Sequence, residues 1–257
     1  MAKQRVMGIP FRDPRVVQFV GDLKKSGCEV AFELTDALGC NAETFYEVPP
    51  RVKYKKTAWQ TVDILHELLH VRHFYVDGFG MLAWPDESPP TSDVRQSVQH
   101  VRDIIDNTVV HRELWREYHF LPISNIFFDE CRTDLERGLV GLARNKSGLN
   151  HTLLVADRLW MAKMCLSDFG TALAERDRPT CRDFLAHFSG KHHDAEEVVD
   201  FLKLLDDAKN LADPKEHEES QVEFVTMLGL PQVQLHISRY DAQKRDFLPS
   251  NRSSATA

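Results

Sequence analysis

Long apolar runs are missing from this sequence. No segment reaches the roughly 18 uninterrupted apolar residues that a membrane-spanning helix needs. The amino-terminal segment MAKQRVMGIPFRDPR also lacks the apolar core of a secretory signal. We therefore expect a cytoplasmic protein without a membrane partner.

Cysteine, glycine and proline are all scarce. The five cysteines, at positions 28, 40, 131, 165 and 181, never form a CxxC pair. This scatter predicts reduced thiols and argues against a disulfide framework or a cysteine-rich zinc site. Only 12 glycines and 12 prolines are present, so a collagen-like or low-complexity chain is excluded.

An excess of positive charge is also lacking. The 32 Lys and Arg residues face 39 Asp and Glu residues, and the net charge of −7 argues against a nucleic-acid partner. We interpret the one short cationic run, RVKYKK at 51–56, as a solvated loop. Glycine-rich phosphate loops and GxSxG signatures are absent too, so the sequence indicates neither a nucleotide-driven enzyme nor a serine hydrolase.

The sequence does contain enough apolar material for one sizeable core. Its 257 residues are 42% hydrophobic, which suits a core with a small appended subdomain. The patterns predict an α+β fold that is mostly helical, with a small amino-terminal antiparallel sheet packed on one helix. We expect a core at 1–128, a helical region at 129–250 packed on it, and a disordered tail at 251–257.

The expected elements follow from residue spacing. Residues 29–34 and 45–48 alternate in polarity and predict two paired strands of a hairpin, and a Pro- and Ser-rich loop is expected at 81–92. A late strand is expected at 233–237. Helical spacing predicts helices at 14–25, 57–76, 92–118, 129–145, 152–176, 179–187, 194–211 and 214–228.

One segment carries a specific chemical pattern: His66-Glu67-Leu68-Leu69-His70, an HExxH sequence inside a predicted helix. Residues four apart project from the same helix face, so both imidazoles can reach one metal ion. Imidazole suits Zn²⁺, and a tetrahedral site leaves room for a third protein ligand and a water. Glu67 would lie beside that water and could take its proton. The simpler interpretation is two ordinary histidines on an amphipathic helix.

Through His66, Glu67 and His70 the chain resembles the zincin-type metallopeptidases. The resemblance covers about the first half of the chain, with the candidate strands 29–34 and 45–48 upstream. It implies a Zn²⁺ cofactor, Glu67 as the catalytic residue, and a peptide or protein substrate aligned along the edge strand of a preceding sheet. It also implies a third zinc ligand farther along the chain.

The sequence leaves that third ligand open. The residues after His70 lack the glycine and third histidine of metzincins, and no clear ExxxD of the thermolysin type follows. In the helix predicted at 92–118, His111 and Asp106 lie at the borders of the apolar arc, whereas Asp103 lies on the polar side. A ligand must point inward from a packed helix, so His111 is the first choice and Asp106 the second. Glu130 remains a third possibility.

We therefore expect a zinc-dependent hydrolase, a peptidase in which His66, His70 and His111 bind the metal and Glu67 activates water. One alternative is a zincin-like binding or regulatory protein that no longer cleaves anything. Another is a helical interaction protein in which HExxH is accidental. Candidate donors to an oxyanion, each more readily explained by packing, are Tyr75, Tyr118 and His119.

Overall fold

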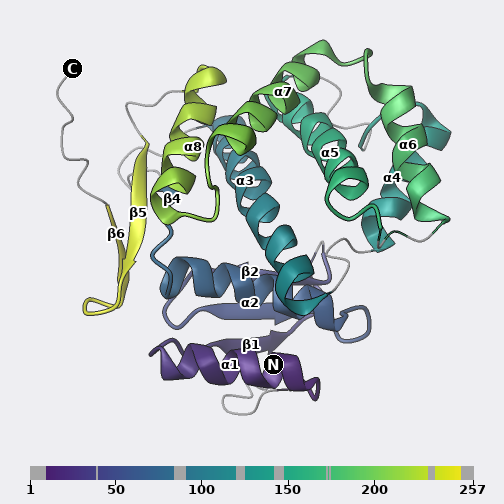
Figure 1. Ribbon diagram of the computed structural model, residues 1–257. Coiled ribbons are helices and arrows are strands. Elements are labelled where there is room, and N and C mark those ends of the chain that lie inside the picture. Colours follow the sequence, from purple (N-terminus) through teal and green to yellow (C-terminus); the bar gives the residue numbers. More distant parts are fainter. Residues whose placement is uncertain are drawn as a thin grey trace, which may run out of the picture. The chain divides into compact units, whose positions relative to one another are not determined.

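Residue contacts group the chain into two units, Met1–Ala83 with His236–Ala257, and Trp84–Leu235. The computed structural model describes residues 10–38, 40–83, 91–119, 125–141, 148–171, 173, 175–230 and 235–249 (Figure 1). This grouping differs from the expected division at residue 128, because the carboxyl-terminal strands pair within the first unit. The expected tail at 251–257 lies outside the described residues.

The first sheet consists of β1 (Ala31–Leu34), β2 (Ala42–Phe45) and β3 (Arg51–Tyr54), in the order β1-β3-β2. Strand β3 runs parallel to β1 and antiparallel to β2. The predicted hairpin between residues 29–34 and 45–48 is therefore wrong, since β3 lies between the two strands. The sheet is mixed rather than antiparallel for the same reason.

Strand β3 comes from the cationic run at 51–56, which was expected to be a solvated loop. Its alternation explains the error: Val52 and Tyr54 are buried, whereas Arg51 and Lys53 face the other side of the sheet. There the Arg51 guanidinium donates to Glu33 at 2.7 Å and Lys53 Nζ lies 4.0 Å from the centre of the Phe45 ring. The Arg51 and Lys53 side chains, which were expected to be solvated, thus interact with groups on the neighbouring strands.

Helices α1 (Pro14–Lys25) and α2 (Thr61–Tyr75) complete this part of the first unit (Figure 1). Helix α1 begins where the sequence predicts, because the Asp13 carboxylate accepts from the backbone N–H of Arg15 at 2.9 Å and Pro14 needs no amide partner. Helix α2 packs against α1, β2 and β3. Its completely buried side chains are Ile64, Leu65, Leu68, Leu69 and Val71.

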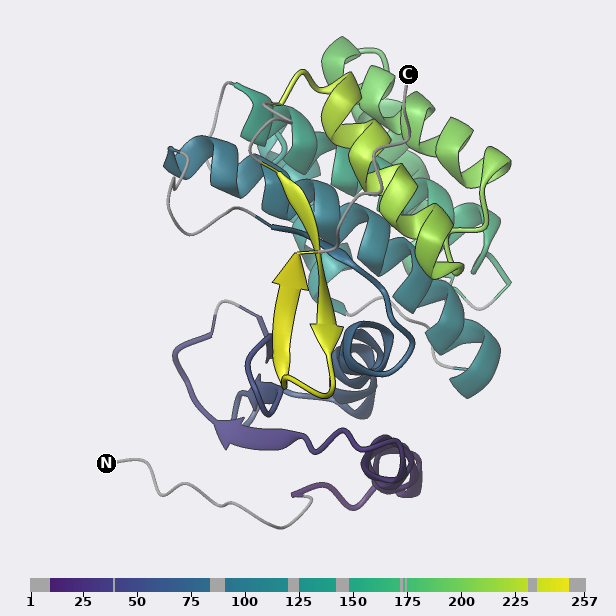
Figure 2. The same ribbon diagram turned by 90° about the vertical axis from the view of Figure 1, so that its left-hand side faces the viewer.

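A second small sheet joins distant parts of the chain. Strand β4 (Met81–Ala83) pairs antiparallel with β5 (His236–Asp241), which forms a hairpin with β6 (Asp246–Pro249). Figure 2 shows this hairpin in yellow. Strand β4 occupies the start of the loop expected at 81–92, and residues 84–90 of that loop lie outside the described residues. Strand β5 begins near the end of the late strand expected at 233–237.

The second unit is built from helices. Their bounds are α3 (Ser92–Tyr118), α4 (Asn125–Arg137), α5 (Leu149–Ser167), α6 (Asp177–Phe188), α7 (His193–Ala208) and α8 (Pro214–Met227). The predicted helices at 129–145 and 152–176 are too long at their carboxyl ends. Helix α4 stops because Gly138 turns left-handed, with a φ of 67°. Helix α5 packs against α3, α6 and α7.

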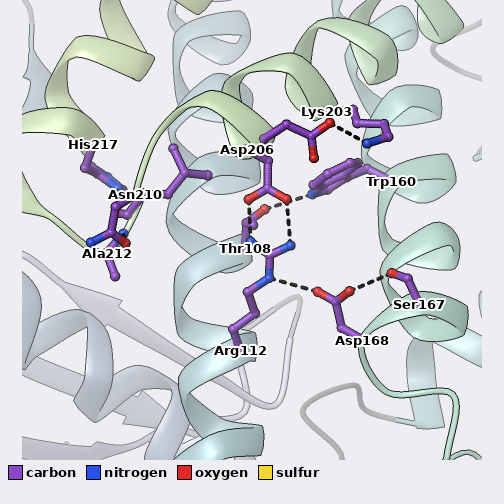
Figure 3. Close-up of polar contacts among 12 residues, drawn as sticks. Thr108, Arg112, Trp160, Ser167, Asp168, Lys203, Asp206, Asn210, Ala212 and His217 are labelled. Carbon is purple, nitrogen blue, oxygen red and sulfur yellow. Dashed lines mark hydrogen bonds and ion pairs between the residues drawn. The ribbon is translucent and has the colours of Figure 1, made fainter.

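An arginine cluster joins three helices of this unit (Figure 3). Arg112 on α3 binds both carboxylate oxygens of Asp206 on α7, and its Nε donates to Asp168 at the end of α5 at 2.8 Å. Beside it the indole of Trp160 donates to the Thr108 hydroxyl at 2.8 Å. The cluster fixes helices that are far apart in the sequence.

The architecture confirms the predicted α+β class with mostly helical content. In the parts of the chain that the structure describes, no helix is both long and apolar enough to cross a membrane.

Candidate metal centre

Helix α2 presents the HExxH residues from a well-fixed position. Its first turn is stabilised by Asp63, whose carboxylate accepts the backbone N–H of Gln60 at 2.7 Å. Its apolar side chains are buried on several sides, so rotation of the helix would expose core residues. A helix held in this way fixes the direction of the side chains it carries.

His66 and His70 converge as the i, i+4 spacing predicts. Their Nε2 atoms lie 3.1 Å apart and their ring centroids 4.8 Å apart. His70 is buried, with 8% of its surface exposed, and His66 is half-buried. The pair therefore points two nitrogen donors at one place beside the helix.

This geometry fits two ligands of a single zinc ion. Tetrahedral zinc with nitrogen ligands at about 2.0–2.1 Å holds those nitrogens about 3.3 Å apart. The observed separation of 3.1 Å is close to that value. No large movement of either ring is needed for His66 and His70 to bind one ion.

Glu67 lies between the two histidines in sequence and is half-buried. Burial raises the pKa of its carboxyl to about 7; hydrogen bonds from Thr44 oppose that shift, and the Glu43 and Asp63 carboxylates add to it. A group that exchanges its proton near neutral pH is well matched to general acid–base work.

The edge strand β2 runs beside the same helix. The Thr44 hydroxyl donates to the backbone carbonyl of Glu67 at 3.1 Å, and Asn41 Nδ2 donates to the Asp63 carboxylate at 3.2 Å. Asp63 and Glu67 are four residues apart on α2, so the two hydrogen bonds lie along one side of the helix. The strand is therefore bound to α2 next to Glu67.

Thr44 is not among the functional residues that the sequence predicted. Its signal was the alternation of the segment AETF at 42–45, in which Ala42 and Thr44 point inward and Glu43 outward. That alternation was obscured because the strand was expected at 45–48, three residues later.

The first-choice third ligand, His111, is a buried residue of α3 in the second unit, with 8% of its surface exposed. The described residues contain no group of three or more His, Cys, Asp and Glu side chains placed to hold a metal. His111 as a ligand of the proposed site stays a prediction.

Asp106, the second choice, has another role within its own unit. Its Oδ1 lies 2.7 Å from Nε2 of His217 on α8, and both side chains are buried. The other ring nitrogen of His217 lies 3.2 Å from the backbone carbonyl of Leu211. This buried pair joins α3 to α8 and accounts for Asp106 without a metal.

Three of the remaining candidates also have structural explanations. Glu130 forms an ion pair with Arg158. The Tyr75 hydroxyl donates to the backbone carbonyl of Glu47 at 2.8 Å, which occupies the proton that an oxyanion would need. His119 caps the end of α3 in a left-handed conformation, with a φ of 53°.

Comparisons with protein families, with curated proteins and with solved structures found no match for this chain.

Proposed function

We propose that this chain is a zinc-dependent hydrolase that cleaves peptide bonds. The observation that carries the proposal is the convergence of His66 and His70 at 3.1 Å on a helix whose next residue after His66 is a half-buried glutamate. Two imidazoles and one carboxylate in this order match what hydrolysis with an activated water requires.

Each residue has a defined part in this proposal. His66 and His70 hold the ion through Nε2, and the third ligand in this proposal is the one that the sequence favours, His111. Bound Zn²⁺ supplies Lewis acidity, which lowers the pKa of water and polarises a carbonyl. Glu67 takes a proton from the attacking water at its carboxylate and passes it to the nitrogen of the leaving amine.

The substrate and compartment are part of the same proposal. A peptide in extended form would lie along β2, the edge strand next to Glu67, and pair with backbone groups on its outer side. The free thiols at all five cysteines agree with a reducing compartment such as the cytoplasm.

The first test is zinc content of the full chain, purified without added zinc and measured by mass spectrometry. We expect about one zinc per chain in the wild type, as in other sites with three protein ligands, and its loss in both His66→Ala and His111→Ala. His193→Ala is the control, because that histidine side chain is 84% exposed on another helix. Zinc lost only in His66→Ala would place the third ligand elsewhere. No zinc even after it is supplied would overturn the proposal.

The second part of the test separates an enzyme from a zinc-binding protein. Glu67→Gln should keep its zinc and lose about 10²- to 10⁴-fold in the rate of hydrolysis of dye-labelled casein, since only the proton transfer is removed. A wild type that binds zinc but cleaves nothing would leave a binding protein with a zincin-like site.

A further inference from the structure

Strand β2 and helix α2 are joined by side chains at two positions only four helix residues apart. Asn41 binds Asp63 in the first turn of α2, and Thr44 binds Glu67 one turn later. Asn41 also accepts the backbone N–H of Lys55 through its carbonyl at 2.9 Å, which holds the start of the strand on β3. The first contact anchors the strand, and the second reaches the proposed catalytic glutamate.

Thr44 is placed to control the distance between these two elements. Its side chain is buried, with 9% of the residue surface exposed, and its Cα lies opposite Val52 of the neighbouring strand β3. Pairing with β3 fixes its backbone, while its hydroxyl donates to the Glu67 carbonyl at 3.1 Å. Any change in that hydrogen bond therefore shifts α2 at Glu67 relative to the edge strand.

We infer that Thr44 is a positioning residue of the proposed site, which sets Glu67 relative to a peptide lying along β2. This inference rests on the proposed function. Because β2 is an edge strand, a peptide can add to its outer side, and the peptide position is then set by β2. The position of the catalytic carboxylate is set by α2, and the hydrogen bond of the Thr44 hydroxyl is a contact that ties the two elements together beside Glu67.

The metal ligands depend much less on this contact. His66 and His70 converge through the helix itself, and their separation does not involve β2. Removing the Thr44 hydroxyl should therefore leave zinc binding intact and affect the chemical step. A shift of about 1 Å in a catalytic group costs on the order of 10²-fold in rate.

The experiment uses the full zinc-loaded chain and compares Thr44→Val, Thr44→Ser and Asn41→Ala. Valine keeps the shape of threonine without its hydroxyl, serine keeps the hydroxyl, and Asn41→Ala removes the hydrogen bond from Asn41 to Asp63 on α2. We measure zinc content and the kcat and KM for dye-labelled casein. We expect equal zinc in all proteins, kcat about 10- to 100-fold lower in Thr44→Val with little change in KM, and most of the rate recovered in Thr44→Ser.

The outcomes separate this inference from the proposed function. If the wild type cleaves casein and Thr44→Val matches it, or if Asn41→Ala loses as much kcat as Thr44→Val, Thr44 has no positioning role. If Thr44→Ser is as slow as Thr44→Val, the hydroxyl is not responsible and the inference fails.

A wild type that holds zinc but does not cleave casein would end the peptidase proposal. The positioning role of Thr44 is then tested by the binding of acetohydroxamate to the zinc-loaded wild type and to Thr44→Val. This zinc chelator has a hydroxyl that needs a carboxylate acceptor such as Glu67. Binding about 10-fold weaker in Thr44→Val alone, the factor expected for a partly misplaced acceptor, would support the inference. Equal binding in the wild type and Thr44→Val would overturn it, and a wild type without zinc would overturn both proposals.

Discussion

A single carboxylate, that of Asp13, stabilises the first turns of two helices. It accepts the backbone N–H of Arg15 and the Arg15 guanidinium, and it also accepts the hydroxyl of Thr61 at the start of α2 at 3.2 Å. The hydrogen bonds from Arg15 are the main reason that the pKa of Asp13 is lowered to about 2. Asp13 thus connects α1 to the helix that carries the proposed site.

This carboxylate should make folding dependent on pH in acid. Because its pKa is lower in the folded protein, its stabilisation is present above its ordinary pKa of 3.8 and is lost as the pH falls towards 2. We expect the ionised Asp13 carboxylate to contribute about 1 kcal/mol to the free energy of unfolding. Urea unfolding of wild type and Asp13→Asn between pH 5 and pH 2 measures it, since asparagine still caps the helix but carries no charge. Equal pH slopes in the two proteins would contradict this account.

At the scale of elements, the helices of the second unit are held together by charged groups as well as by apolar packing. Arg112 is the clearest case, because one guanidinium serves carboxylates from two other helices. The interaction with these two carboxylates holds the pKa of Arg112 above its ordinary value, and the hydrogen bonds to Asp206 are the largest cause. Its side chain is 24% exposed, so water screens part of this interaction.

Replacing Arg112 should weaken the contacts among α3, α5 and α7. We expect Arg112→Ala to lower the free energy of unfolding by about 2–3 kcal/mol, because two carboxylates lose their partner in a place that is largely shielded from water. Arg116→Ala, an exposed position one turn later on α3, should change it by less than about 0.5 kcal/mol. Chemical denaturation checks both, and equal effects would show that the cluster is not a special contact.

At the scale of the whole molecule, the carboxyl-terminal hairpin belongs to the same unit as the amino-terminal residues. The hairpin β5–β6 pairs with β4, and Phe247 on β6 contacts the rings of Tyr46, Tyr75 and Tyr240. These ring centroids lie 5.1–6.5 Å from that of Phe247, within the usual range for aromatic pairs. Aromatic packing therefore secures the hairpin on the end of α2.

Phe247→Ala should loosen this second sheet. We expect a loss of about 2 kcal/mol in the free energy of unfolding, since a half-buried aromatic side chain and its ring contacts are removed. Amide hydrogen exchange at Met81–Ala83 should accelerate in the variant, because β4 pairs only through β5 in this sheet of the described chain. Lys244→Ala, at the exposed turn of the hairpin, is the control. Unchanged exchange in β4 would show that Phe247 does not hold the hairpin.

The sequence by itself determined the local parts of this protein. The helices begin at Asp13-Pro14 and Asp213-Pro214 because capping and the first turn depend only on neighbouring residues. The approach of His66 to His70 is local as well, since any α-helix brings residues four apart to one face. These features were predicted correctly because every atom that decides them lies within one or two turns.

Only the tertiary structure decided the rest. Strand β3 inserts between β1 and β2, β4 pairs with a strand that begins at His236, and Asp106 meets a histidine 111 residues away. Such pairings depend on which surfaces remain to be buried once the local elements have formed, and alternation alone does not encode their partners. The partial burial of Glu67 and its contact with Thr44 belong to this second kind. They arise because strand β2 packs on α2, the helix that carries the HExxH pattern.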